Sequence, residues 1–204
     1  MSAWTEPPTL VGQHVTLRPL VFEDRDALVA AAADGALTEL FFTNVSGLND
    51  PDAFMAAIFT ERDFGRAMPF AVETPDGTLV GLTRYMRMSA AHKRIEIGGT
   101  FYARSVQRSG VNTEAKLLLL GHAFEALGCN VVQLRTDWFN KRSQAAIERL
   151  GAKRDGILRN HQVMDGRSRD LVVYSIIASE WPGVRQNLRF LLARHAGELR
   201  GNSA

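Results

Sequence analysis

The sequence predicts a single domain of the α+β (mixed α/β) class, in which helices flank a mostly antiparallel sheet of about seven strands. The chain has 204 residues, which fits one domain, and no repeat or low-complexity linker divides it. Several β-prone runs are joined by short turn sequences, as in antiparallel hairpins. The order of strands and helices also differs from the regular alternation of a doubly wound nucleotide-binding fold. We expect one domain over 1–204, with a core of about 14–178 and a C-terminal amphipathic helix over about 179–196.

The first third of the chain predicts one strand followed by two helices. Residues 14–20 alternate polar and apolar side chains, as a half-buried strand does, and 23–33 is rich in Ala and Leu with acids in its first turn. Asp50 and Pro51 fit the N-cap and first position of a second helix, which continues at helical spacing toward Phe64.

The middle of the chain predicts a meander of three strands. The β-prone runs 69–74 and 78–88 are joined by Pro75, Asp76 and Gly77, which have hairpin turn chemistry. Residues 94–102 read as the third strand. Its two glycines, Gly98 and Gly99, indicate a bulge or a close approach of another group to the backbone.

The second half predicts a helix, a strand, a helix, a strand pair and a final helix. Leucines at helical spacing after residue 112 predict one helix that stops at Gly128. A strand over 131–136 precedes a helix that begins at Asn140 and is closed by Gly151. The runs 152–163 and 170–178 form the last hairpin around Asp165 and Gly166.

Composition narrows the classes of function. The net charge is only +2, with scattered basic residues, which argues against nucleic-acid binding. No apolar run approaches the roughly 18 residues of a membrane span, and the N-terminus lacks signal-peptide features, so we expect a cytoplasmic protein without membrane contact. Cys129 is the only cysteine, which excludes an internal disulfide and a zinc site built on cysteine pairs. We expect it to be buried and structural.

The loop QRSGVN, residues 107–112, lies directly before the apolar helix. Free N–H groups at a helix N-terminus, reinforced by the helix dipole, favour anions. Gly110 allows a close approach of backbone and ligand, whereas Rossmann and P-loop phosphate motifs are absent. The alternative is an ordinary loop whose glycine turns the chain.

Three motifs together resemble the GNAT superfamily of N-acetyltransferases. Gln107-x-x-Gly110-x-Asn112, between Glu96-Ile-Gly98 and TEAKLLLLGHAFEALG, is similar to its motif A. The run TDWFNKRSQAAIERLGA from residue 136 resembles the companion motif of the ribosomal-protein N-terminal acetyltransferase (RimJ/RimL-like) branch, and so does the final hairpin. The match covers roughly 14–178.

The resemblance implies acetyl-CoA as the co-substrate, without a metal. In the family, loop N–H groups bind the pyrophosphate and the preceding strand binds the pantetheine arm like an added strand. The corresponding residues here are Thr100, Phe101, Tyr102, Gln107, Arg108, Ser109, Gly110, Val111 and Asn112, with Asn140 also holding the arm. Asn112 departs from the family pattern, which commonly has Gly or Ala at this position.

The resemblance also implies candidates for proton transfer. Many members use a Tyr on the helix after the fifth strand to protonate the thiolate, but Ile147 stands there in this chain. We therefore expect Ser143 to protonate the sulfur. The alternative role of Ser143 is that of a solvent-facing residue in the first helical turn, and the alternative role of Asn140 is that of a plain N-cap. Glu96 is the expected base, with His161 as an alternative.

The predicted function is acetyl transfer to a primary amine, either a protein N-terminus or a small molecule. A non-catalytic CoA-binding regulatory module stays open because of Ile147, and the C-terminal helix leaves a scaffold role or a homodimer open. Trp138, Phe139 and Tyr174 are candidates for the acceptor pocket or for the core.

Overall fold

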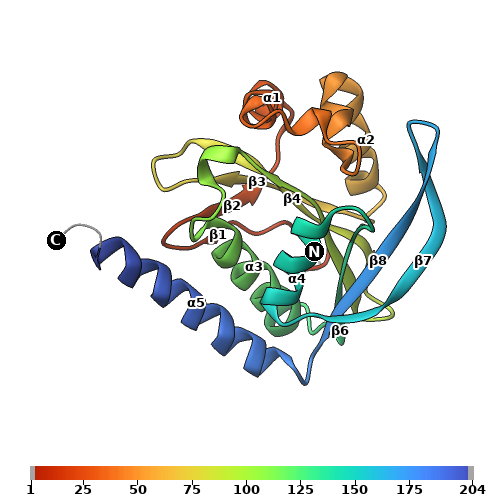
Figure 1. Ribbon diagram of the computed structural model, residues 1–204. Helices are drawn as coiled ribbons and strands as arrows, with labels where there is room; N and C mark the ends of the chain where they lie inside the picture. The colour runs from red at the N-terminus through yellow and green to blue at the C-terminus, as the bar shows by residue number, and fades with distance from the viewer. Residues whose placement is uncertain (1–2, 202–204) are drawn as a thin grey trace.

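One eight-stranded sheet runs through the molecule (Figure 1). The computed structural model describes residues 3–201, and the side chains of 3–194. The strand order is β1-β2-β3-β4-β5-β6-β8-β7, and every neighbouring pair is antiparallel except β5 with β6. The strands are β1 Leu10–Val11, β2 Thr16–Pro19, β3 Met68–Glu73, β4 Leu79–Ser89, β5 Arg94–Tyr102, β6 Val131–Asp137, β7 Lys153–Met164 and β8 Arg167–Ile177.

Helices cover both faces of this sheet. Helices α1 (Arg25–Ala33) and α2 (Pro51–Asp63) lie on one face, while α3 (Val111–Gly121), α4 (Lys141–Leu150) and α5 (Trp181–Gly201) lie on the other (Figure 1). Tyr85 of β4 points to the α3 face, where its hydroxyl donates to the Leu119 carbonyl at 2.6 Å. Because side chains alternate along a strand, Thr83 shares this face and Arg84 faces α1 and α2.

The predicted mixed α/β class and its hairpins are confirmed, with two corrections. The sheet has one strand more than expected, because β1 is only two residues long and too short for a periodic pattern. The prediction of one continuous helix to Gly128 is wrong: α3 ends at Gly121 and a π-helix spans His122–Ala126. The Tyr85 hydroxyl occupies the Leu119 carbonyl, and a side chain inserted at this ladder disturbs the helical pattern.

The predicted bulge in β5 is present and opens the sheet. The β4–β5 register shifts between the pairs Leu82↔Phe101 and Arg84↔Gly98, and Gly99 has φ +56°, which favours glycine. On its other side β5 pairs with β6 only as far as Ile97↔Leu134. Residues 98–102 therefore have no strand partner on that edge.

A buried carboxylate fixes α3 to the N-terminal segment. Glu114, in the first turn of α3, accepts the backbone N–H groups of Gln13, His14 and Val15 at 2.5–2.9 Å. An anion near a helix N-terminus is also favoured by the helix dipole.

Cys129 is buried as predicted, and burial raises the pKa of its thiol to about 11.

Replacing Glu114 with Ala should destabilise the fold by about 3 kcal/mol, because three backbone donors lose one charged acceptor. Urea unfolding would show a lower midpoint at an unchanged slope. Glu23→Ala is the matched control, since Glu23 is exposed, and should change stability by less than about 0.5 kcal/mol. Equal stability of the two variants would contradict this role.

Candidate functional site

The loop before α3 is held in place by the side chains of Gln107 and Ser109. Gln107 Nε2 donates to the Tyr102 carbonyl at 2.9 Å, and its Oε1 accepts from Arg142 of α4 at 2.6 Å. Ser109 Oγ donates to the Val106 carbonyl at 2.6 Å and accepts the Val111 N–H at 3.3 Å. Gln107 thus joins the end of β5 to the first turn of α4.

Several N–H groups of this loop are left without a partner. In the part of the chain that the structure describes, the N–H groups of Arg108, Ser109, Gly110 and Asn112 have no acceptor. They gather at the N-terminus of the 11-residue helix α3, whose dipole also favours an anion. Gly110 has an ordinary φ of −67°, but a Cβ there would lie 2.8 Å from Cδ2 of His14, so a larger residue would displace the His14 ring.

The predicted pantetheine segment, Thr100 to Tyr102, lies on the edge of β5 that β6 leaves free. Phe101 and Tyr102 are buried, and the Tyr102 carbonyl is already occupied by Gln107. Burial raises the pKa of the Tyr102 hydroxyl, which is enclosed without a hydrogen-bond partner among the described residues. The free edge thus lies at the C-terminal end of β5, directly before the loop that carries the unpaired N–H groups.

Lys116 of α3 is a buried residue that the sequence analysis did not single out. Its Nζ donates to Thr100 Oγ1 at 3.1 Å, and Thr100 Oγ1 lies 2.8 Å from Thr83 Oγ1. Burial lowers the pKa of Lys116 to about 7. A signal was present in the sequence, because Lys116 shares the helix stripe of the buried residues Leu119, Leu120 and Ala123.

Asn140 and Ser143 lie together at the start of α4. Asn140 Oδ1 accepts the Ser143 N–H at 3.0 Å, so this oxygen serves as the N-cap. The Ser143 hydroxyl has no hydrogen-bond partner among the described residues and stays free to donate a proton. Ile147 is buried in the core, as expected for an apolar side chain one turn further on.

Glu96 is buried on the α1/α2 face of β5. Its Oε2 is 2.7 Å from Arg87 Nη1 and 3.1 Å from Arg135 Nε. Its Oε1 lies 3.3 Å from the position of a Cβ on Gly98 and so points toward the bulge. His161, the alternative base, is exposed on the edge strand β7.

A second buried carboxylate lies at the end of β6. Asp137 is fully buried and pairs with Arg167 at 2.7 Å and with Arg169 at 3.0 Å, and Arg169 also bonds Asn44 at 2.9 Å. This cluster ties β8 to the segment after α1 and was not predicted. Sequence patterns gave no sign of it, because its members are distant along the chain.

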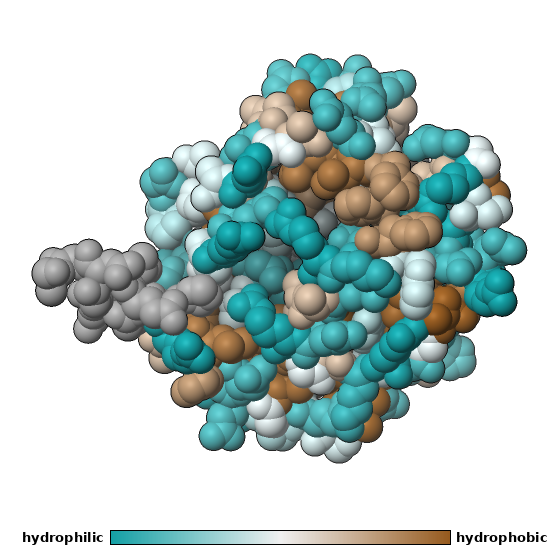
Figure 2. Space-filling view, in the orientation of Figure 1, coloured by the Kyte–Doolittle hydropathy of each residue, from teal (hydrophilic) through white to brown (hydrophobic). Residues whose placement is uncertain are grey.

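The three aromatic candidates for the acceptor pocket differ in burial: Tyr174 lies in the core, Trp138 is half-buried and Phe139 is exposed. Tyr174 is fully buried and its hydroxyl bonds Glu148 of α4, while Trp138 packs against Lys141 Nζ at 3.8 Å. Only Phe139 is exposed, with its ring 6.1 Å from that of Phe41. Figure 2 shows hydrophobic side chains gathered below α1 and α2 on this side of the molecule.

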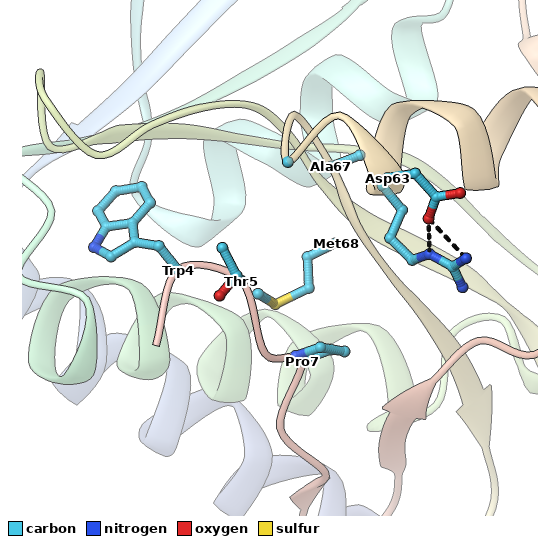
Figure 3. Close-up of a pocket in the computed structure, with 8 residues that line it drawn as sticks. Trp4, Thr5, Pro7, Asp63, Ala67 and Met68 are labelled. Carbon is cyan, nitrogen blue, oxygen red and sulfur yellow. Dashed lines mark hydrogen bonds and ion pairs between the residues drawn. The ribbon is translucent and has the colours of Figure 1, made fainter. Parts of the chain in front are cut away.

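A separate cavity of about 300 Å³ lies between the N-terminal segment and the junction of α2 with β3. Figure 3 shows Trp4, Thr5, Pro7 and Met68 around it, beside the ion pair of Asp63 with Arg62. None of the predicted site residues lines this cavity, so it is distinct from the site at the β5 edge.

None of the helices within residues 3–201 is long and apolar enough to span a membrane. Within the same residues, no three His, Cys, Asp or Glu side chains gather as metal ligands would.

The chain is similar to proteins of one known family. The model of the acetyltransferase (GNAT) domain matches residues 14–153. The chain belongs to this GNAT acetyltransferase family. It is therefore an acyltransferase of the N-acetyltransferase type that uses acetyl-CoA as its co-substrate and transfers the acetyl group to an amine.

Individual relatives extend this result along the chain. YdaF of Bacillus subtilis, provisionally named a ribosomal N-acetyltransferase, is 32% identical over 108 residues, which cover 53% of this chain and 58% of YdaF. A GCN5-related N-acetyltransferase from Brucella melitensis is 30% identical with a TM-score of 0.80, covering 92% of this chain and 86% of that one. Mycobacterium smegmatis RimJ, solved with CoA-disulfide, is 23% identical with a TM-score of 0.75 over 94% and 97% of the two chains, and shows the shared fold.

Lys116 should make the stability of this GNAT protein depend on pH. Its pKa in the folded chain, about 7, lies below the usual 10.5, so between these values the unfolded chain binds a proton that the folded chain does not. Its unfavourable effect on folding is therefore absent above about pH 10.5, grows as the pH falls, and is constant below about pH 7.

In urea unfolding, the free energy of unfolding of the wild type should rise relative to that of Lys116→Met as the pH increases. The expected rise is up to about 1.4 kcal/mol per pH unit between pH 7 and 9. Lys93→Met, which removes an exposed lysine, should follow the wild-type pH dependence. Parallel curves for the wild type and Lys116→Met would show that Lys116 is not buried as a neutral amine.

Proposed function

We propose that this enzyme acetylates the N-terminal amine of a protein, with acetyl-CoA held between the α3 loop and the free edge of β5. The observation that carries the proposal is the meeting of these two unpaired backbone surfaces at residues 98–112. A diphosphate suits the loop N–H groups, and a chain with amide groups suits the open strand edge. Coenzyme A combines both features in one molecule.

In this proposal each cofactor residue has a stated part. The backbone of Arg108 to Asn112 binds the diphosphate, while Thr100 to Tyr102 bind the pantetheine arm. Gln107 acts through its side-chain bonds, which hold the loop against β5 and α4. Asn140 Nδ2 reaches the arm while its Oδ1 caps α4.

Proton transfer in this proposal falls to Ser143 and Glu96. The Ser143 hydroxyl donates a proton to the departing thiolate, which turns a poor leaving group into a neutral thiol. Glu96 Oε1, turned toward Gly98, accepts the amine proton, directly or through water, while Arg87 and Arg135 hold Oε2. The exposure of His161 favours Glu96 over it as the base.

The provisional name of YdaF supports a ribosomal protein as acceptor, and small amines are the second candidate. A cytoplasmic location, a homodimer and a single domain over 1–204 stay part of the proposal. Val184 and Leu188 of α5 are buried against their own chain, so a homodimer would need other residues.

We expect mass spectrometry to detect one added acetyl group on free N-terminal peptides incubated with the enzyme and acetyl-CoA. Peptides whose N-terminus is already blocked are the control and should stay unmodified. Exclusive acetylation of small amines in the same mixture would transfer the proposal to the second candidate. Thermal stabilisation by CoA without acetylation of any amine would refute acetyl transfer under these conditions.

Ser143→Ala should lower kcat at least about tenfold while changing the KM for acetyl-CoA little, because only the proton to the leaving thiolate is lost. Steady-state kinetics with an accepted peptide measures both constants. Ser168→Ala removes an exposed hydroxyl on β8 and should match the wild type. An unchanged kcat in Ser143→Ala would reject this assignment.

A further inference from the structure

An unpaired arginine lies against the bulge of β5 on the face that α1 and α2 cover. Arg84 of β4 stands opposite Gly98, and a Cβ on Gly99 would lie 2.4 Å from both its Nε and its Nη2. Within the described part of the chain, Arg84 makes no hydrogen bond and no ion pair. Its Nε is shielded from solvent, whereas the terminal nitrogens are not fully shielded.

The two basic groups beside the bulge differ in how they tolerate burial. Lys116, on the opposite face, can lose its proton and has a hydroxyl partner in Thr100. Burial also lowers the pKa of Arg84, but from a usual value of 12.5, so its guanidinium keeps the charge at neutral pH. A largely buried charge without an ionic partner is destabilising, and an anion that reaches the partly exposed terminal nitrogens would compensate it.

Glu61 and Glu96 attract Arg84 electrostatically, but neither forms an ion pair with it. On the same face Arg87 and Arg135 share Glu96, and at its edge Arg167 and Arg169 share Asp137. Another nearby acid, Glu61 of α2, is paired with Arg66. With the Glu61–Arg66 pair and Arg84 included, six guanidinium groups thus accompany three carboxylates in this region. The excess of positive charge favours a ligand that brings a negative one.

We infer that Arg84 binds a carboxylate of the acceptor, so that the preferred substrate is an amine with a negative charge near its reactive nitrogen. The inference rests on the proposed function, because it takes this face to be the acceptor side. The planar guanidinium fork matches a carboxylate in two parallel hydrogen bonds. Glu96 lies on the same face as the bulge, which places the proposed base and the anion site beside one strand segment.

The test compares matched pairs of acceptors that differ only in a carboxylate. C-terminally amidated peptides with Glu or Gln at the second position form one pair, and β-alanine with β-alaninamide forms another. The wild type should favour the carboxylate member at least about tenfold in kcat/KM. Arg84→Gln should abolish this preference by slowing that member, while the neutral member and the KM for acetyl-CoA change less than about threefold.

Controls separate this role from a structural one. Arg62→Gln removes a paired guanidinium that is partly exposed on α2 and should keep the preference. Arg84→Gln should not lower the melting temperature, because no protein partner is lost. If that variant fails to fold, the preference of the wild type and its partial retention in Arg84→Lys still decide.

Equal use of both members by the wild type would overturn the inference, as would a raised KM for acetyl-CoA in Arg84→Gln. Calorimetry with the N-acetylated Glu and Gln peptides in the presence of CoA reads the site without turnover. Tighter binding of the Glu peptide that Arg84→Gln loses supports the inference, and equal binding refutes it. If the enzyme acetylates no acceptor in the kinetic assay, the proposed function is contradicted, while calorimetry still tests the role of Arg84.

Discussion

The separation of β5 from β6 after Ile97 and Leu134 is the constraint on which the site depends. Gly99 adds a residue to β5 at φ +56°, which turns the strand away from its parallel neighbour and leaves a backbone edge unpaired. Unpaired backbone groups in a folded interior need a partner. The edge is therefore open over residues 98–102, apart from the Tyr102 carbonyl, which accepts from Gln107, and in the proposed function it binds the cofactor.

Three polar ties fix α3 relative to this edge. Glu114 holds the first turn of the helix to the N-terminal segment, Lys116 bonds Thr100 of β5, and Gln107 joins the preceding loop to β5 and α4. These contacts hold the loop N–H groups and the open strand edge at a fixed position relative to each other. A cofactor that binds both surfaces then loses little free energy to ordering them, which is the advantage of a preorganised site.

The two faces of the sheet around the bulge differ in electrostatic character. On the α3 face Lys116 bonds Thr100, and burial lowers its pKa to about 7, so its positive charge is weakened near neutral pH. On the other face Arg84 keeps its charge, and the surrounding arginines outnumber the carboxylates. In the proposed function this difference directs an anionic acceptor to the face that carries Arg84.

The sequence by itself determined the fold class, the hairpin at Asp165 and Gly166, the β5 bulge and the loop before α3, because residues a few positions apart encode each of these features. It did not determine the two-residue strand β1, the π-helix after Gly121, or the environment of Arg84. Tertiary structure alone decided those. A short strand exists only through its neighbour, and the partner of a buried charge depends on packing between segments that are remote along the chain.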